Sequence, residues 1–193
     1  MTPKQIEKTL KEIANIKRTL AAEKRKIGCY DDSRGLRYIP TSLYIKLQDY
    51  ENGLIYIKWF QKNFPDDSGF PNFLFECAII YFKTGNLKLA ETKTFETFCS
   101  NTYLIDKFLD SPIIPIDKDE NSNWDSPEFC KYLIYTSSQL ELSDFTDWLI
   151  KFIVTEKFVT LSAKYIEITK RLKKTEDRET RGYLIKQMYQ LKI

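Results

Sequence analysis

The feature that most constrains the fold is a turn that occurs twice, with helical spacing of apolar residues on both sides. In residues 81–99, Gly85 and Asn86 separate two stretches in which apolar residues recur with the period of an α-helix. Residues 44–67 repeat this arrangement, and aligning Gln48 with Gly85 gives a period of 37 residues. A repeat of this length predicts helical hairpins that stack side by side.

Both units resemble tetratricopeptide repeats, in which helix A, a Gly-Asp/Asn turn and helix B each have fixed positions for large, small or aromatic residues. The second unit fills these positions with Leu74, Cys77, Ala78, Tyr81, Gly85, Asn86 and Ala90. In the first unit, the matching positions are Thr41 and Tyr44 of helix A and Gly53, Ile57, Phe60 and Pro65 of helix B. The resemblance covers about residues 34–102. It implies an all-α fold of antiparallel helical hairpins, stacked as a short α-solenoid, with close helix contacts at Gly53 and Ala90.

The remaining segments are predicted from apolar spacing and from helix start and stop signals. We expect a single domain over residues 1–193, with an N-terminal helix at 1–27, repeats at 33–63 and 71–101, a loop at 110–125, and C-terminal helical hairpins at 126–193. Asp32 is predicted to cap the first repeat, and Pro40 to kink or restart its first helix. Residues 129–139 and 143–155 are expected to pair as a hairpin. Gly182 either makes the last helix less favourable or marks a close helix crossing. An unrelated all-α domain of ordinary hairpins is the alternative.

The residue types present argue against catalysis. The sequence has no histidine, which is the commonest general base and metal ligand. Its four cysteines lie far apart, and no phosphate-binding glycine loop occurs. We therefore expect no enzymatic activity and no cofactor. The N-terminus lacks the apolar core of a signal peptide, and no apolar run approaches the roughly 20 residues that span a bilayer, so a cytoplasmic location without membrane contact is expected.

One stretch has the spacing of a calcium-binding loop. The oxygen-bearing residues at its positions 1, 3, 5, 7, 9 and 12 are Asp117, Asp119, Asn121, Asn123, Asp125 and Glu128. Ser122 stands where such a loop has a glycine for its sharp turn. A solvated, mobile loop is therefore favoured, and calcium binding stays open as the alternative.

Charge is unevenly distributed along the chain. Residues 1–27 and 156–193 each carry a net charge of +5, whereas residues 28–155 carry −7. This pattern predicts contacts between the terminal helices and the middle of the chain, or two separate binding faces. Basic ends can also bind phosphates, so an RNA-associating module is the alternative function. The acidic middle argues against that alternative, because it repels nucleic acid.

The leading hypothesis is a non-enzymatic adaptor that binds a peptide or partner protein on the concave surface of its repeats. The repeat register implies that this surface is lined by Gly35, Tyr38, Ser42, Ile45, Lys46, Asn72, Phe75, Ile79, Phe82 and Lys83. The partner-binding residues predicted from that set are Tyr38, Lys46, Asn72, Phe75 and Lys83. Asn72 can bridge a peptide backbone, and Lys46 or Lys83 can meet a carboxylate. The alternative is that Phe75, Ile79 and Phe82 are covered by terminal helices and belong to the core.

Overall fold

The computed structural model describes residues 1–30, 32, 34–120 and 122–193, and all the regular secondary structure in these ranges is helical. The α-helices are α1 (Pro3–Ile27), α2 (Ile39–Leu47), α3 (Tyr50–Asn63), α4 (Pro71–Lys83), α5 (Leu87–Ser100), α6 (Leu104–Phe108), α7 (Ser143–Ile153), α8 (Glu156–Lys174) and α9 (Arg178–Tyr189). Short 3₁₀-helices are η1 (Leu36–Tyr38), η2 (Pro127–Tyr132) and η3 (Leu140–Leu142). The predicted all-α class is therefore confirmed. No helix in the described ranges is long and apolar enough to cross a membrane.

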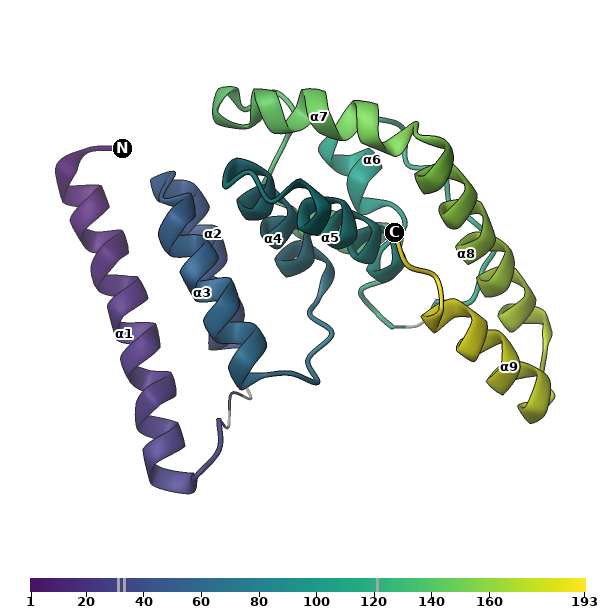
Figure 1. The fold of residues 1–193 in the computed structure, drawn as a ribbon, viewed down its shortest axis with the longest axis horizontal. Helices are drawn as coiled ribbons and strands as arrows, with labels where there is room; N and C mark the ends of the chain where they lie inside the picture. Colours follow the sequence, from purple (N-terminus) through teal and green to yellow (C-terminus); the bar gives the residue numbers. More distant parts are fainter. Residues whose placement is uncertain (31, 33, 121) are drawn as a thin grey trace.

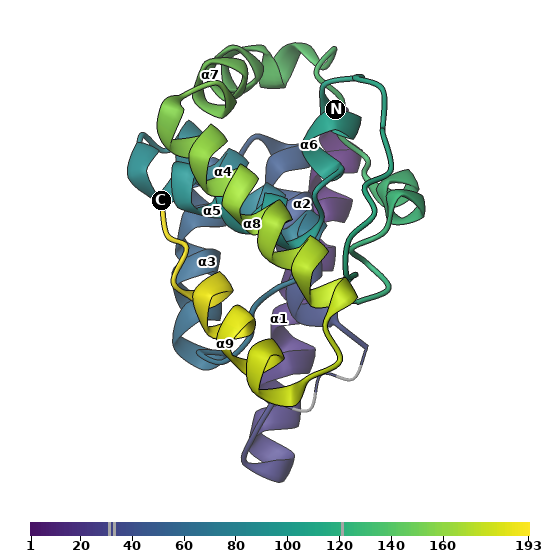
Figure 2. The same cartoon turned by 90° about the vertical axis from the view of Figure 1, so that its right-hand side faces the viewer.

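The helices pack in an order that follows the chain (Figures 1 and 2). Helix α1 packs against α2, α2 against α3, and α4 against α5. The next layer is formed by α7, which contacts α4, and by α8, which contacts α5. Helix α9 packs on α8. Figure 1 shows α1 and α9 at opposite ends of the molecule.

Local sequence signals explain where the first helices begin and end. Thr2 accepts a hydrogen bond from the backbone N–H of Gln5 and closes a capping box at the start of α1. Gly28 ends α1 in the left-handed conformation, with φ of 79°. Asp32 accepts hydrogen bonds from the N–H groups of Leu36 and Arg37 at 2.8 and 2.7 Å. The expected capping role of Asp32 is thus confirmed, although the helix that it caps is the short η1. Residues Asp31 and Ser33 lie outside the described part.

Helix α4 is the centre of the core. Ten of its 13 residues are buried, including Phe75, Ala78 and Ile79, which are fully inaccessible to solvent. Gly53 of α3 lies at a close crossing, because a Cβ atom there would stand 3.0 Å from Ile80 Cδ1 of α4 and 3.3 Å from Tyr44 Cβ of α2. The small-residue position predicted at Gly53 therefore coincides with a tight contact. A Cβ atom added at Gly182 would have no atom within 4 Å, so of the two alternatives given for this residue the close helix crossing is wrong.

Replacing Ala90 with leucine is expected to destabilise the protein. Ala90 is fully buried on α5, which packs along α4, so three extra carbon atoms would overpack the contact between these helices. Overpacking of this kind costs about 1–3 kcal/mol. Chemical denaturation of Ala90→Leu would measure the loss. Lys88→Leu on the exposed side of α5 is the matched control and should change stability little, and a neutral Ala90→Leu would contradict the assigned contact.

The predicted helical hairpin at 129–139 and 143–155 is wrong. Residues 127–142 contain only η2 and η3, joined by irregular backbone, and the observed partner of α7 is α8. The physical reason lies in the polar run 136–139, where the N–H of Thr136 donates to Gln139 Oε1 at 3.0 Å and the hydroxyls of Thr136 and Ser138 lie 2.8 Å apart. Such local side-chain hydrogen bonds compete with those of a helix.

Candidate functional site

The site with the most distinctive chemistry is one face of α4 and the chain that lies over it. Asn72, Glu76, Ile79 and Lys83 follow one another at helical spacing along this face. Residues 130–144, which we call the covering segment, run from the end of η2 along the connection that precedes α7 and into the first turn of α7. On the right-hand side of Figure 2, this connection runs beside the packed helices toward the start of α7.

Two polar side chains of α4 hold the covering segment at its two ends. Asn72 Nδ2 donates a hydrogen bond to the backbone carbonyl of Tyr132 at 2.9 Å. Lys83 Nζ donates to the carbonyl of Glu141 at 2.6 Å and forms an ion pair with Asp144 at 2.5 Å. We predicted that Asn72 would contact the backbone of a bound peptide and that Lys83 would contact a carboxylate. In the structure, both side chains make these kinds of contact with residues of the same chain.

Between these ends, the covering segment alternates in the way that an extended chain does. Leu133 and Tyr135 are 7% and 5% exposed and face the core, whereas Tyr132 and Ile134 are 58% and 68% exposed. The ring of Tyr135 lies 6.3 Å from that of Phe75, measured between centroids. A two-residue period is typical of extended polypeptide, and it explains why helical periodicity gave the wrong structure here.

Glu76 is the most unusual group on this face, because it is a carboxyl side chain at only 6% residue exposure. Tyr135 donates its hydroxyl proton to Glu76 Oε1 at 3.1 Å. Thr41 Oγ1 lies 2.5 Å from Glu76 Oε2 and 2.9 Å from the carbonyl of Tyr38. A hydroxyl group has one proton and a carbonyl can only accept. Both contacts are hydrogen bonds at once when Thr41 donates to the carbonyl and a protonated Glu76 donates to Thr41.

The electrostatic environment agrees with a neutral Glu76. Burial raises the pKa of Glu76 to about 8, and its hydrogen bonds with Thr41 and Tyr135 only partly oppose this effect. Burial also raises the pKa of the Tyr135 hydroxyl well above its usual value, with a further contribution from Glu76. The three side chains therefore form an uncharged hydrogen-bonded chain at neutral pH, which links α2, α4 and the covering segment.

The structure brings together three of the five predicted partner-binding residues. Asn72, Phe75 and Lys83 share the covered face of α4. Phe75 is fully buried, so the predicted open groove at this residue is wrong. Ile79 is also fully buried, and Phe82 packs against Phe145 and Trp148 of α7. These residues thus belong to the core, as the alternative held, but the chain that covers them is residues 130–153 and not a terminal helix.

Tyr38 and Lys46 do not join that face in the expected way. Tyr38 donates its hydroxyl proton to Asp67 at 2.7 Å, and Arg37 Nε donates to the same carboxylate at 2.7 Å. Burial and the contact with Asp67 raise the pKa of Tyr38 to about 12. Tyr38 therefore belongs to a network that connects η1 to the turn after α3. Lys46 is exposed on α2.

Sequence reasoning missed the pairing of Glu76 with Thr41 and Tyr135. A signal for Glu76 was present, because it is the one acidic residue of α4 and apolar residues surround it in the sequence FLFECAII. An acid inside a helix that is buried on all sides needs hydrogen-bonding partners. The identity of those partners had no local signal, since Thr41 and Tyr135 lie 35 and 59 residues away in the chain.

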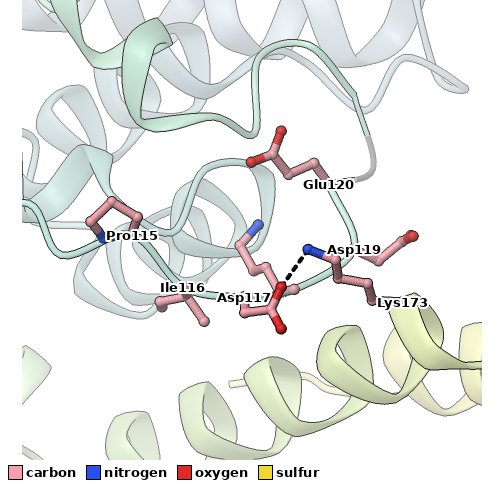
Figure 3. Close-up of a pocket in the computed structure, with 7 residues that line it drawn as sticks. Pro115, Ile116, Asp117, Asp119, Glu120 and Lys173 are labelled. Atoms are coloured by element: carbon pink, nitrogen blue, oxygen red, sulfur yellow. Dashed lines mark hydrogen bonds and ion pairs between the residues drawn. The ribbon is translucent and has the colours of Figure 1, made fainter.

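A second candidate place is the acidic stretch 115–120, which lies against α8 (Figure 3). It borders an open hollow of about 600 Å³, and Asp117 forms an ion pair there with Lys173. The N–H of Asp119 donates to the carbonyl of Thr169 at 3.0 Å, and its carboxylate lies 3.8 Å from Arg181. The predicted contact between the basic C-terminal helices and the acidic middle is therefore present at this point.

Beneath that surface, Lys118 and Asp125 form an ion pair at 2.6 Å in which the side chains are 0% and 1% exposed. Lys118 Nζ also lies 5.6 Å from the centre of the Tyr103 ring. The prediction of a solvated loop is thus wrong for these two residues. Nothing in the sequence pattern indicated that a lysine from this polar stretch is buried.

The described residues that have calcium-loop spacing in the sequence do not lie together around one point in the structure. Asp117 faces Lys173, Asp125 is buried against Lys118, and Asn121 lies outside the described residues. Among the described residues, no group of three or more histidine, cysteine, aspartate or glutamate side chains could hold a metal ion.

Comparison of the chain with protein-family models found no match, and comparisons with curated proteins and with solved structures found no significant match either.

Proposed function

We propose that this chain is a non-enzymatic adaptor built from tetratricopeptide-like hairpins, α2–α3, α4–α5 and α7–α8, which binds a segment of a partner protein. In this arrangement the first helices of the hairpins, α2, α4 and α7, lie next to one another, and they contact in the order α2–α4–α7. Neighbouring first helices create the surface on which helical repeats bind extended segments.

The observation that carries the proposal is the way α4 holds residues 130–144. Asn72 and Lys83 bind two backbone carbonyls and one carboxylate, which are groups that any protein segment with an acidic residue offers. Backbone contacts give affinity for extended polypeptide, and side-chain contacts give selectivity. The lack of histidine in the sequence agrees with a binding role. The cytoplasmic location stays an expectation.

The alternative, RNA association through the basic termini, requires two distant surfaces. Helices α1 and α9 lie at opposite ends of the molecule in Figure 1, so their positive charges do not form one continuous patch. Part of the charge on α8 and α9 is neutralised by Asp117 and Asp119. A protein segment is therefore the favoured ligand.

The test is a two-arm binding experiment with the full chain. A random-peptide phage library should yield peptides that lose binding to the Asn72→Ala, Lys83→Ala double variant and keep it with Lys46→Ala, the exposed control. In the second arm, gel shifts with single-stranded RNA over a salt series should show no binding at physiological ionic strength. Failure to enrich any peptide, together with salt-sensitive RNA binding, would overturn the proposal in favour of the alternative.

A further inference from the structure

We propose that residues 130–137 are a tethered occupant of the α4 site, which a partner segment of the same chemistry replaces. This inference rests on the proposed function. The partner segment is an extended stretch in which an apolar residue stands two positions before a tyrosine, as Leu133 stands before Tyr135. The site is thus regulated by its own chain, which competes with the partner.

The first argument is that the part of this stretch that follows η2 already has the form of a bound peptide. Its buried side chains, Leu133 and Tyr135, stand on either side of the outward-facing Ile134. The backbone of Leu133 is extended, with φ of −73° and ψ of 121°. An extended segment that presents alternate side chains to a helical surface, and is held there by its backbone carbonyl, can be replaced by another segment with the same pattern.

The second argument concerns selectivity for tyrosine. The Tyr135 hydroxyl donates to Glu76 Oε1, and the other oxygen of Glu76 is engaged by Thr41. A phenylalanine in place of Tyr135 would leave the buried Oε1 without this donor. Sites that hydrogen-bond a hydroxyl discriminate against the analogue that lacks it, because a buried polar atom is left unpaired. Glu76 is therefore the group that makes the site selective for a tyrosine.

The third argument is that the internal segment satisfies the site incompletely. Asn72 Nδ2 donates to the carbonyl of Tyr132, but the buried Asn72 Oδ1 makes no hydrogen bond with the described residues. The ring of Tyr50 lies beside Lys83, with its centre 5.5 Å from Lys83 Nζ, and the buried hydroxyl of Tyr50 has no hydrogen-bond partner among the described residues either. An asparagine side chain can bind a carbonyl and an N–H of the same peptide. An incoming segment that supplies the N–H gains a contact that residues 130–137 do not make.

The proposal makes a quantitative claim about competition. A tethered segment acts at an effective concentration in the millimolar range, so it lowers the apparent affinity for any free segment that uses the same site. Weakening the tethered copy should therefore strengthen binding of a free copy. Tyr135→Phe removes the hydrogen bond to Glu76 with a minimal change in shape. Tyr132→Phe makes the same chemical change on the outward side and is the matched control.

The experiment measures fluorescence anisotropy of a labelled peptide with the sequence of residues 130–138, titrated with full-length chains. The Tyr135→Phe chain should bind it about fivefold more tightly than the unaltered chain, the change expected from the loss of one typical hydrogen bond. The Tyr132→Phe chain should match the unaltered chain. A peptide with phenylalanine at the position of Tyr135 should bind the Tyr135→Phe chain about fivefold more weakly than the tyrosine peptide does.

Equal binding of the peptide to all three chains, or binding to none, would overturn the tethered-occupant proposal. Phage-selected peptides that still depend on Asn72 and Lys83 would in that case leave the adaptor function standing, so the two failures are distinguishable. If Tyr135→Phe does not fold, the unaltered chain provides the second measurement. An excess of the free peptide should then increase proteolytic cleavage within residues 136–141, and unchanged cleavage would contradict the proposal.

Discussion

Replacing Lys118 with methionine is expected to destabilise the protein by about 3–5 kcal/mol, because it leaves the buried carboxylate of Asp125 without its ammonium partner. Both side chains of this pair are almost completely inaccessible to solvent, so water cannot solvate the Asp125 carboxylate once the ammonium group of Lys118 is removed. Urea denaturation of the variant and of the unaltered chain at pH 7 would measure the difference. An effect much below this range would mean that the pair is accessible to water in solution.

Two controls separate the buried pair from ion pairs in general. The double variant Lys118→Met, Asp125→Leu removes both charges and should recover much of the lost stability, as buried pairs replaced by apolar residues often do. Lys173→Ala breaks the exposed pair with Asp117 above it, and its effect should be far smaller because solvent screens that pair. A double variant as unstable as Lys118→Met alone would contradict the assigned origin of the effect.

Replacing Glu76 with glutamine is expected to change how stability depends on pH. Burial raises the pKa of Glu76 from 4.5 to about 8 in the folded chain. Between these values, the folded chain keeps the proton and the unfolded chain has released it. Stability therefore falls as pH rises from about 5 to about 8, by roughly 1.4 kcal/mol per pH unit from this one group, and levels off above pH 8.

The Glu76→Gln variant lacks this proton and should lose that part of the slope. Its stability relative to the unaltered chain should therefore increase steadily between pH 5 and pH 8, as measured by urea denaturation at several pH values. The difference between the two proteins isolates Glu76 from other titrating groups. Glu128→Gln removes an exposed carboxyl from η2 and should leave the slope unchanged. A constant difference between Glu76→Gln and the unaltered chain would show that Glu76 is ionised in the folded state at neutral pH.

Helices with strong local signals were predictable from the sequence. The first predicted repeat was expected to end at residue 63, and α3 ends there, because Asp49 caps the start of this helix and the Phe64-Pro65 turn ends it. Pro40 was predicted either to kink or to restart a helix, and α2 begins at Ile39 with Pro40 in its first turn, a position to which proline is suited. In both cases, the information lies within a few residues of the boundary.

The site was less predictable because its contacts join distant parts of the chain. Asn72 and Lys83 were predicted to contact a partner, and in the structure they contact residues 60 and 61 positions further along the same chain, in a segment with no repeat signature. A hydrophobic period of two in three or four residues is too short to distinguish an extended segment from a helix. The sequence pattern alone therefore could not indicate that residues 130–144 cover α4.

The central claim is that α4 holds residues 130–144 through Asn72 and Lys83, as a ligand that can be released. Hydrogen–deuterium exchange of the full chain tests it most directly. The amides of residues 132–142 should exchange faster than those of α4, and the Asn72→Ala, Lys83→Ala double variant should accelerate them by about tenfold or more while α4 is unchanged. Exchange of 132–142 at the same rate as α4, unaltered in the double variant, would contradict the claim, because it would make this segment inseparable from the core.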